Sequence, residues 1–207
     1  MWTTLTASGA ARFPSAGCAL FLALSSAVCL APPAAAESQT RATVAAMDKT
    51  AAERDGRHDF DFLTGAWHVH HRRLRHALAG STEWYAFDGT CRFQTIFDFG
   101  NMDENVLDMP SKRVYGVTVR FYNRTTHEWS IYWGTDKLGE IGLPATVGKF
   151  DEHGVGRFYD HETFEGKPIV VRYMWTRPTP NAPHWEQAFS PDGGKTWETN
   201  WTSDFTR

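Results

Sequence analysis

The sequence predicts an all-β protein, an antiparallel up-and-down meander of roughly ten strands closed into a barrel. From His58 onward, short runs rich in Val, Ile, Thr and aromatic residues alternate with Gly, Asn, Asp and Pro. No stretch after residue 60 keeps a helical period. A sheet of so many strands must close or fold over to protect its edges, and an up-and-down barrel is the simplest closure.

Turn residues separate the expected strands along the chain. Asp-Gly at 88–89, Asn-Arg-Thr-Thr at 123–126 and Glu-Gly-Lys-Pro at 165–168 are typical turn sequences. The second and third runs can also form a single bent strand. The runs are residues 65–75, 82–88, 90–98, 103–107, 114–122, 127–134, 145–151, 156–162, 168–176, 183–190 and 196–206.

Ahead of the barrel, the chain has the features of an exported protein. Residues 1–36 contain the apolar run CALFLALSSAVCL followed by small residues, which is typical of a secretory signal peptide. Residues 37–56 are polar and alanine-rich and are expected to form a flexible leader. Residues 57–207 remain for the barrel domain. We therefore expect a periplasmic or secreted protein that is not inserted in the membrane once the signal is cleaved.

Charge and cysteine content narrow the classes of partner. The formal net charge of −3 argues against nucleic acid or an anionic membrane as the main partner. Two of the three cysteines lie within the predicted signal peptide, so Cys91 would be alone in the mature chain and could form no intrachain disulfide. The barrel must then be held together by its own core, which a 14% aromatic content can supply.

The first expected strand, GAWHVHHRRLR, is rich in histidine. Because side chains alternate faces along a strand, Trp67, Val69 and His71 are expected inside, and His68 and His70 outside. The outer pair could reach one metal ion, but no Cys or carboxylate on this run completes a ligand set, so no metal site is expected. An inward His71 either bonds to a buried partner or faces a cavity, and both interpretations stay open.

This strand also carries a resemblance to known barrels. The G-x-W of Gly65 and Trp67 resembles the lipocalin or calycin signature, in which the Trp closes the barrel floor beneath a basic residue of the last strand; Arg207 matches that position. Together, HDFDFLTGAWHVHHRR, EWYAFDGTCR, FGNMDEN, WSIYW and WEQAFSPDGGKTWETNWTSDFTR resemble a family of exported, lipocalin-like bacterial proteins classed as a domain of unknown function. The resemblance covers residues 57–207 and implies a calycin-like barrel without an established activity.

A second resemblance concerns haem. The haem-binding nitrobindins carry G-x-W-x-G-x-G on their first strand, but Val69 and His71 replace the two later glycines here. No cofactor is therefore expected, with haem a minor possibility that rests on His71.

Aromatic and charged residues inside strands are the candidates for a binding site. WSIYW places Trp129 and Trp133 on one face, a pattern that suits either core packing or the wall of a cavity for a flat apolar ligand. Arg120, Arg172 and Glu186 lie within apolar runs, where they either face water or meet inside the barrel to bind an anionic group. The predicted ligand-binding residues are His71, Trp84, Arg120, Trp129, Trp133, Arg172, Trp175 and Glu186, with Trp67 as a further wall residue.

Two further segments have weaker or structural interpretations. FDFGNMDEN places Asp98, Asn101, Asp103 and Glu104 in an expected loop at the barrel mouth, where Asp103 or Glu104 could act as an acid or base but lacks an evident partner. SPDGGKTW at 190–197 matches the Asp-box pattern S-x-D-x-G-x-x-W and is expected to form the hairpin between the last two strands.

The most direct functional prediction is a barrel that binds a small, largely apolar molecule with a polar or anionic group. One alternative is an enzyme that uses His71 or Glu186 as general base beside an arginine, which would require two of these groups to meet across a cavity. The other is an envelope interaction protein with a filled barrel and an exposed aromatic patch.

Overall fold

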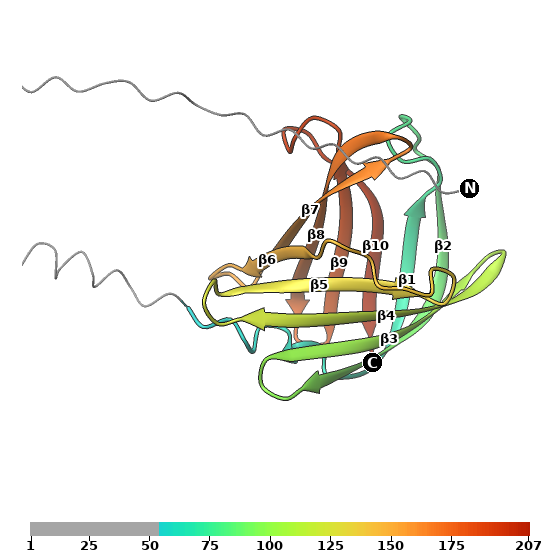
Figure 1. Cartoon of the computed structure of the whole chain (residues 1–207). Helices are drawn as coiled ribbons and strands as arrows, with labels where there is room; N and C mark the ends of the chain where they lie inside the picture. Colours follow the sequence, from blue (N-terminus) through green and yellow to red (C-terminus); the bar gives the residue numbers. More distant parts are fainter. Residues whose placement is uncertain (1–53) are drawn as a thin grey trace, which may run out of the picture. The chain divides into compact units, whose positions relative to one another are not determined.

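Each strand of the protein pairs with the next along the chain, and the first pairs with the last, so the sheet closes into a barrel (Figure 1). The computed structural model describes residues 54–207, and all strand pairings within them are antiparallel. The strands are β1 (Gly65–Leu74), β2 (Trp84–Ile96), β3 (Gly100–Met109), β4 (Lys112–Asn123), β5 (Glu128–Thr135), β6 (Thr146–Phe150), β7 (Gly156–Phe164), β8 (Lys167–Thr179), β9 (Ala182–Ser190) and β10 (Glu198–Thr206). The predicted fold class is confirmed.

Two strand boundaries differ from the expected ones. Residues 82–98 contain the single strand β2, in agreement with the alternative of one bent strand. β3 begins at Gly100, so residues 100–104, expected in a mouth loop, belong to a strand. Its register pairs Asn101 with Arg120, and both Asn101 and Asp103 are buried inside the barrel. The prediction of a loop for residues 100–104 was wrong, because Asn101 and Asp103 lie on the inner face of a strand.

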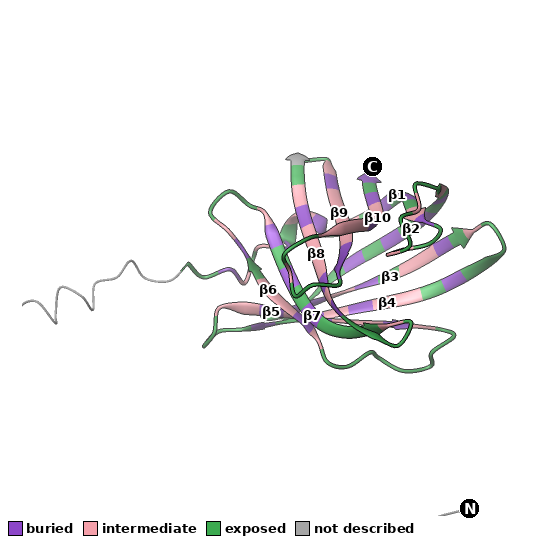
Figure 2. Cartoon of the chain, turned by 90° about the horizontal axis from the view of Figure 1, so that it is seen from above, coloured by how far each residue is buried: buried purple, intermediate pink, exposed green. Residues whose placement is uncertain are grey.

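Burial alternates along most strands, as Figure 2 shows by its alternating purple and green bands. In β1, Trp67, Val69 and His71 are buried, whereas His68 and His70 are exposed. The faces predicted for these five residues from the alternation are therefore confirmed. Most barrel strands thus contribute a buried inner face and a more solvated outer face.

The segment before β1 closes one end of the barrel. The ring of Phe60 is fully buried, with its centroid 5.1 Å from Trp129 and 4.9 Å from Phe150. A short 3-10 helix, η1 (Asp61–Leu63), then brings Leu63 into the same core. Edge-to-face aromatic contacts of this kind add to the free energy gained from burial, so this end is a packed floor.

Trp67 and Arg207 complete the floor. The indole N–H of Trp67 donates to the carbonyl oxygen of Leu63 at 2.6 Å, and the guanidinium of Arg207 lies 3.9 Å from the Trp67 ring centroid. Arg207 also donates to the carbonyl oxygen of Thr64 at 2.6 Å. The contact that the lipocalin resemblance implied, a basic residue of the last strand across the floor tryptophan, is present.

Residues 54–56, the end of the predicted leader, are tied to the barrel. The backbone N–H of Gly56 donates to the hydroxyl of Tyr122 at 2.8 Å, and its carbonyl oxygen accepts from the indole N–H of Trp129 at 3.0 Å. The predicted signal peptide and the rest of the leader lie outside the described residues.

The hairpin between β9 and β10 has the hydrogen bonds of an Asp-box. Asp192 accepts from the hydroxyl of Thr196 at 2.6 Å, from the backbone N–H of Thr196 at 2.9 Å and from the hydroxyl of Ser190 at 2.7 Å, and these hydrogen bonds lower the pKa of its carboxyl group. Gly194 has a φ of 92°, and its carbonyl oxygen accepts from the indole N–H of Trp197 at 3.0 Å. The motif therefore has the predicted structural role, since it shapes a turn.

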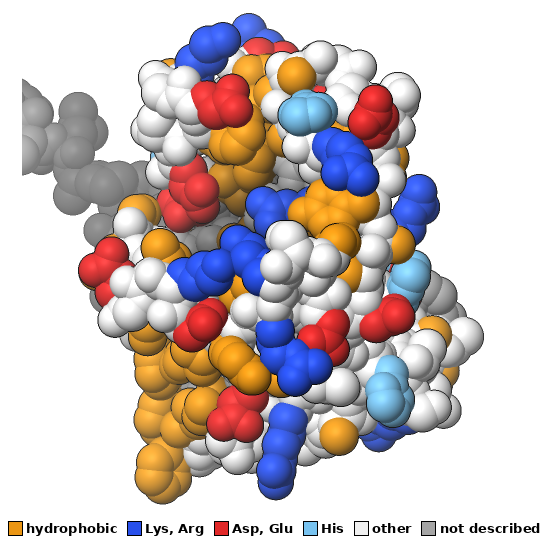
Figure 3. All heavy atoms as spheres, turned by 90° about the vertical axis from the view of Figure 1, so that its right-hand side faces the viewer, with side chains coloured by type: hydrophobic (Ala, Val, Ile, Leu, Met, Phe, Trp, Pro, Cys, Tyr) orange, Lys and Arg blue, Asp and Glu red, His pale blue; other side chains and the backbone are white. Residues whose placement is uncertain are grey.

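Charged side chains of both signs and histidines are interspersed with separate patches of hydrophobic side chains on the face drawn in Figure 3. Within residues 54–207 no helix is long and apolar enough to span a membrane.

Candidate ligand-binding cavity

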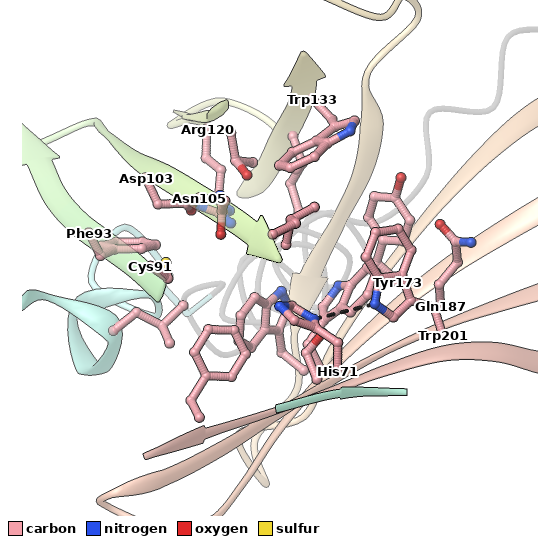
Figure 4. Close-up of a pocket in the computed structure, with 18 residues that line it drawn as sticks. His71, Cys91, Phe93, Asp103, Asn105, Arg120, Trp133, Tyr173, Gln187 and Trp201 are labelled. Carbon is pink, nitrogen blue, oxygen red and sulfur yellow. Dashed lines mark hydrogen bonds and ion pairs between the residues drawn. The ribbon is translucent and has the colours of Figure 1, made fainter. Parts of the chain in front are cut away.

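A cavity of about 120 Å³ lies inside the barrel, above the packed floor. Its walls consist of inward side chains from β1, β2, β3, β4, β5, β8, β9 and β10 (Figure 4). Most of this lining is aromatic or aliphatic, and a few polar groups face one another across the space. The lining residues are Leu63, His71, Cys91, Phe93, Asp103, Asn105, Leu107, Thr118, Arg120, Ile131, Trp133, Tyr173, Trp175, Trp185, Gln187, Trp201, Ser203 and Phe205.

His71 is the polar group of the β1 wall. Its ring stacks on Phe87 at 4.7 Å, and its Nδ1 lies 2.8 Å from the hydroxyl oxygen of Ser203 and 3.4 Å from Nε1 of Trp201. An indole nitrogen can only donate, so Nδ1 accepts and the ring proton belongs on Nε2. Burial, together with a smaller effect of the nearby His70, lowers the pKa of His71 to about 4. His71 is therefore a neutral imidazole at neutral pH.

Gly89 makes room for this imidazole. A Cβ atom at this position would lie 3.1 Å from Nε2 of His71 and 2.4 Å from the carbonyl oxygen of Val106. The missing side chain lets the ring lie against the backbone of β2.

Arg120 is the charged group of the opposite wall and is only 4% exposed. Its Nη1 donates to Asn101 Oδ1 at 3.2 Å and forms an ion pair with Oδ2 of Asp103. The guanidinium carbon lies 5.0 Å from the ring centroids of both Phe60 and Phe93. Nε is buried and has no hydrogen-bond partner within the described chain. The ion pair and the two rings fix the guanidinium, while its Nε donor stays unused.

Asp103 is fully engaged by its neighbours. Its Oδ1 accepts from the side-chain amide of Asn105, and its Oδ2 pairs with Arg120. In Figure 4, Asp103, Asn105 and Arg120 lie together on one side of the cavity, facing His71 and Trp201 on the other. The structure therefore supplies the partner that sequence reasoning did not find for Asp103, since two strands must pair in the correct register for it to meet Arg120.

Trp133 and Trp175 line the cavity, as predicted, along with two tryptophans that were not predicted, Trp185 and Trp201. The indole of Trp133 occupies the space beside Gly116, where a Cβ atom would lie 2.1 Å from the indole carbon Cη2. Trp201 shares one face of the last strand with Ser203 and Phe205, because these residues are two apart in the sequence. This alternation was the signal that could have identified Trp201 as a cavity residue.

Two other predicted tryptophans are placed elsewhere. Trp129 is 1% exposed and packs in the floor with its N–H on Gly56, so it supports the cavity from below. Trp84 lies at the outer face of β2, where the guanidinium of Arg72 is 5.4 Å from its ring centroid. Trp67 also belongs to the floor core.

Arg172 and Glu186 face outward, which corrects the hypothesis that they meet a ligand inside the barrel. Their neighbours Tyr173 and Gln187 line the cavity, so strand alternation directs these two side chains to the other surface. They pair with each other there at 3.2 Å, and the guanidinium of Arg172 lies 4.6 Å from the ring centroid of Trp197. Arg172 and Glu186 form an outer ion pair instead of a ligand site.

A hollow beside the segment that joins β5 to β6 borders the cavity. Tyr173, Trp133 and Ile131 line both the cavity and this hollow. Asp160, 8% exposed, lies in the wall of the hollow, and burial raises the pKa of its carboxyl group.

Few side chains of the cavity suit catalysis or metal binding. Burial raises the pKa of the Cys91 thiol and of the Tyr173 hydroxyl, so both groups stay protonated at neutral pH. Within residues 54–207, no group of three or more His, Cys, Asp and Glu side chains is arranged to hold a metal ion. The cavity is therefore equipped for apolar contact and for hydrogen bonds.

Comparison with known proteins supports the fold. No family model and no curated protein matches the chain. Among solved structures, the chain resembles the S-type phycobiliprotein lyase CPES from Guillardia theta, with 10% identity and a TM-score of 0.51 over 75% of this chain and 93% of that one. A redesigned β-barrel matches with 11% identity and a TM-score of 0.38 over 76% of this chain and 98% of that one. The likeness to the lyase agrees with the closed antiparallel barrel.

Proposed function

We propose that this barrel is an exported protein that binds a small, largely apolar molecule carrying a polar or anionic group. The observation that carries the proposal is Arg120, whose Nε is buried in the wall of an aromatic cavity without a hydrogen-bond partner. A buried donor without a partner costs free energy, which a ligand atom can recover. The fold shared with a phycobiliprotein lyase is compatible with a small-molecule site.

The catalytic alternative has less support from the geometry. It required His71 or Glu186 to act as a general base beside an arginine across the cavity. Glu186 lies on the outer surface, and a histidine with a pKa of about 4 is a weak base at neutral pH. Binding without chemistry is therefore the function that these residues favour.

The size of the cavity and the contacts of His71 favour a ligand smaller than haem. The cavity measures about 120 Å³, whereas typical sites for drug-sized ligands measure roughly 300–1,000 Å³. A porphyrin is therefore too large for the cavity in its present form. The Nδ1 atom of His71 is already engaged, and Nε2 lies against the backbone at Gly89. Neither nitrogen is free to reach an iron atom in the open part of the cavity.

An exposed aromatic ladder supports a second candidate function, an interaction with another macromolecule at the cell envelope. On the outer surface, the rings of Phe97, Phe99, Phe121 and Tyr132 follow one another with centroids 5.9, 6.2 and 6.3 Å apart. Phe97 is 86% exposed. Contiguous exposed apolar surface of this kind is typical of interaction sites.

Native mass spectrometry of the exported, unheated protein tests ligand binding. We expect extra mass that denaturation releases, and less of it in Thr118→Leu, which adds volume to the cavity wall. Val119→Leu, on the outer face of the same strand, is the matched control and should keep the ligand. An absorption scan of the same sample would reveal haem by a Soret band. A native mass equal to the denatured mass would contradict a tightly held ligand and favour the interaction function.

A further inference from the structure

We propose that the ligand is a one-ring molecule with a neutral carbonyl oxygen, which accepts a hydrogen bond from Arg120. This inference rests on the proposed binding function and specifies the class of ligand. It follows from the size of the cavity, from the kind of polar atom left without a partner, and from the charge balance of the wall.

The size of the cavity limits the ligand to about one ring. Engineered protein cavities of roughly 150 Å³ hold a benzene molecule, and this cavity measures about 120 Å³. Larger ligands would have to displace wall residues, and Trp133 has little freedom to move because its indole already fills the space beside Gly116. The aromatic walls favour a flat ring, which stacks or packs edge-on against indoles.

The free polar atom determines what the ligand must offer. Among residues 54–207, the fully buried side-chain atoms without a hydrogen-bond partner are all nitrogen donors, and Arg120 Nε is the one whose residue lines the cavity. Arginine has no acceptor, so only a ligand acceptor can satisfy this atom. In contrast, both oxygens of the adjacent Asp103 already accept hydrogen bonds. The wall beside Arg120 thus favours a ligand oxygen over a ligand N–H.

The charge balance favours a neutral oxygen. Asp103 already neutralises Arg120 in a pair whose side chains are 5% and 4% exposed. A carboxylate on the ligand would place a second negative charge beside Asp103 in a region of low dielectric. His71 faces the same cavity as a neutral ring and supplies no compensating charge. A ketone, ester or amide carbonyl accepts the hydrogen bond without this cost.

Three ligands of similar size separate these requirements: acetophenone, with a neutral carbonyl; ethylbenzene, with no acceptor; and benzoate, with an anionic one. Binding to the full-length exported protein is measured by calorimetry and by quenching of tryptophan fluorescence. Since a hydrogen bond to a charged group is worth about 1.5–3 kcal/mol, we expect acetophenone to bind at least about tenfold more tightly than ethylbenzene. Benzoate should bind more weakly than acetophenone.

Variants assign the preference to Arg120. Arg120→Lys keeps the charge beside Asp103 but removes Nε, so acetophenone should lose its advantage over ethylbenzene. Arg172→Lys makes the same change in the outer ion pair and should leave all three affinities unchanged. If near-ultraviolet circular dichroism shows that Arg120→Lys does not fold, the double variant Arg120→Gln with Asp103→Asn removes both charges and serves in its place.

Each contrary result has a separate meaning. Equal affinities for ethylbenzene and acetophenone would overturn the role of the acceptor, and tightest binding of benzoate would overturn the neutral group. If none of the three binds while native spectra show a heavier endogenous ligand, the size limit is wrong and the binding function stands. If none binds and no endogenous ligand is found, the binding function itself fails.

Discussion

Two arginine–carboxylate pairs in this barrel have the same chemistry on opposite faces. Arg120 and Asp103 pair inside, with side chains 5% and 4% exposed, and Arg172 and Glu186 pair outside, with side chains 19% and 16% exposed. In each pair the arginine lies against aromatic rings and its Nε is buried without a partner. Only the inner pair borders a cavity. Position in the strand alternation, and not residue type, therefore decides which pair can meet a ligand.

The inner pair should dominate stability. Asp103→Ala leaves the charge of Arg120 buried without a partner, and breaking a buried pair in this way costs about 3–5 kcal/mol. Because a domain of this kind is stable by only about 5–15 kcal/mol, the loss should be plain in guanidinium unfolding curves. The double variant Arg120→Met with Asp103→Leu, which removes both charges, should be less destabilised than Asp103→Ala. A cost below about 1 kcal/mol for Asp103→Ala would show that the pair is solvated.

Gly116 tests how tightly the inner wall is packed. Gly116→Ala would place a Cβ atom 2.1 Å from the Trp133 ring, so the indole must swing away from β4. Overpacking of this kind typically costs about 1–3 kcal/mol. We also expect the affinity for a cavity ligand to fall by about tenfold or more, because the displaced indole of Trp133 would fill part of the cavity. Calorimetry measures the affinity.

Gly142 offers the matched control for that substitution. A Cβ atom there would meet its nearest neighbour, the carbonyl oxygen of Trp133, at 3.4 Å. Gly142→Ala should therefore keep ligand affinity. If Gly116→Ala bound ligand as well as the original protein, the indole of Trp133 would not be a fixed part of the wall.

The adjacent residues His71 and His70 extend the comparison of inner and outer faces to pH. Burial lowers the pKa of His71 from 6.5 to about 4, so the unfolded chain binds more protons than the folded one between these values. The free energy of unfolding contributed by His71 is thus fully present above about pH 6.5 and is lost as the pH falls toward 4. Each pH unit well inside this window costs about 1.4 kcal/mol.

Unfolding curves at pH 7 and pH 5 measure this effect. The original protein should lose about 1–2 kcal/mol more than His71→Gln over this interval. His70→Gln changes the neighbouring residue on the outer face, where His70 pairs with Asp88 at 2.8 Å, and should keep most of the loss, because burial is the largest cause of the shift in the pKa of His71. The same pH dependence in His71→Gln as in the original protein would assign the effect to other groups.

The sequence predicted the barrel more successfully than the cavity for a physical reason. Period-two burial and turn residues are local, so alternation placed His71 inside and His70 outside correctly. Arg120 and Arg172 each have apolar residues on both sides in the sequence. The alternation within one strand therefore does not show whether the arginine or its apolar neighbours face the core. The contact of Arg120 with Asp103 further depends on the register between β3 and β4, which no single strand encodes. The outward orientations of Trp84 and Glu186 were missed for the same reason.

The outer pair should show the smallest effect. Glu186→Gln removes the charge that faces Arg172 at the partly solvated surface, where ion pairs contribute about 0–1 kcal/mol. Arg172 keeps its contact with the ring of Trp197, so its packing survives the change. A double-mutant cycle of Arg172→Gln and Glu186→Gln should yield a coupling energy below about 1 kcal/mol that shrinks further at high salt. A salt-independent coupling of 3 kcal/mol or more, as expected of a buried pair, would mean that the outer face of β8 and β9 is covered in the working protein, and the outer pair would then belong to an interface.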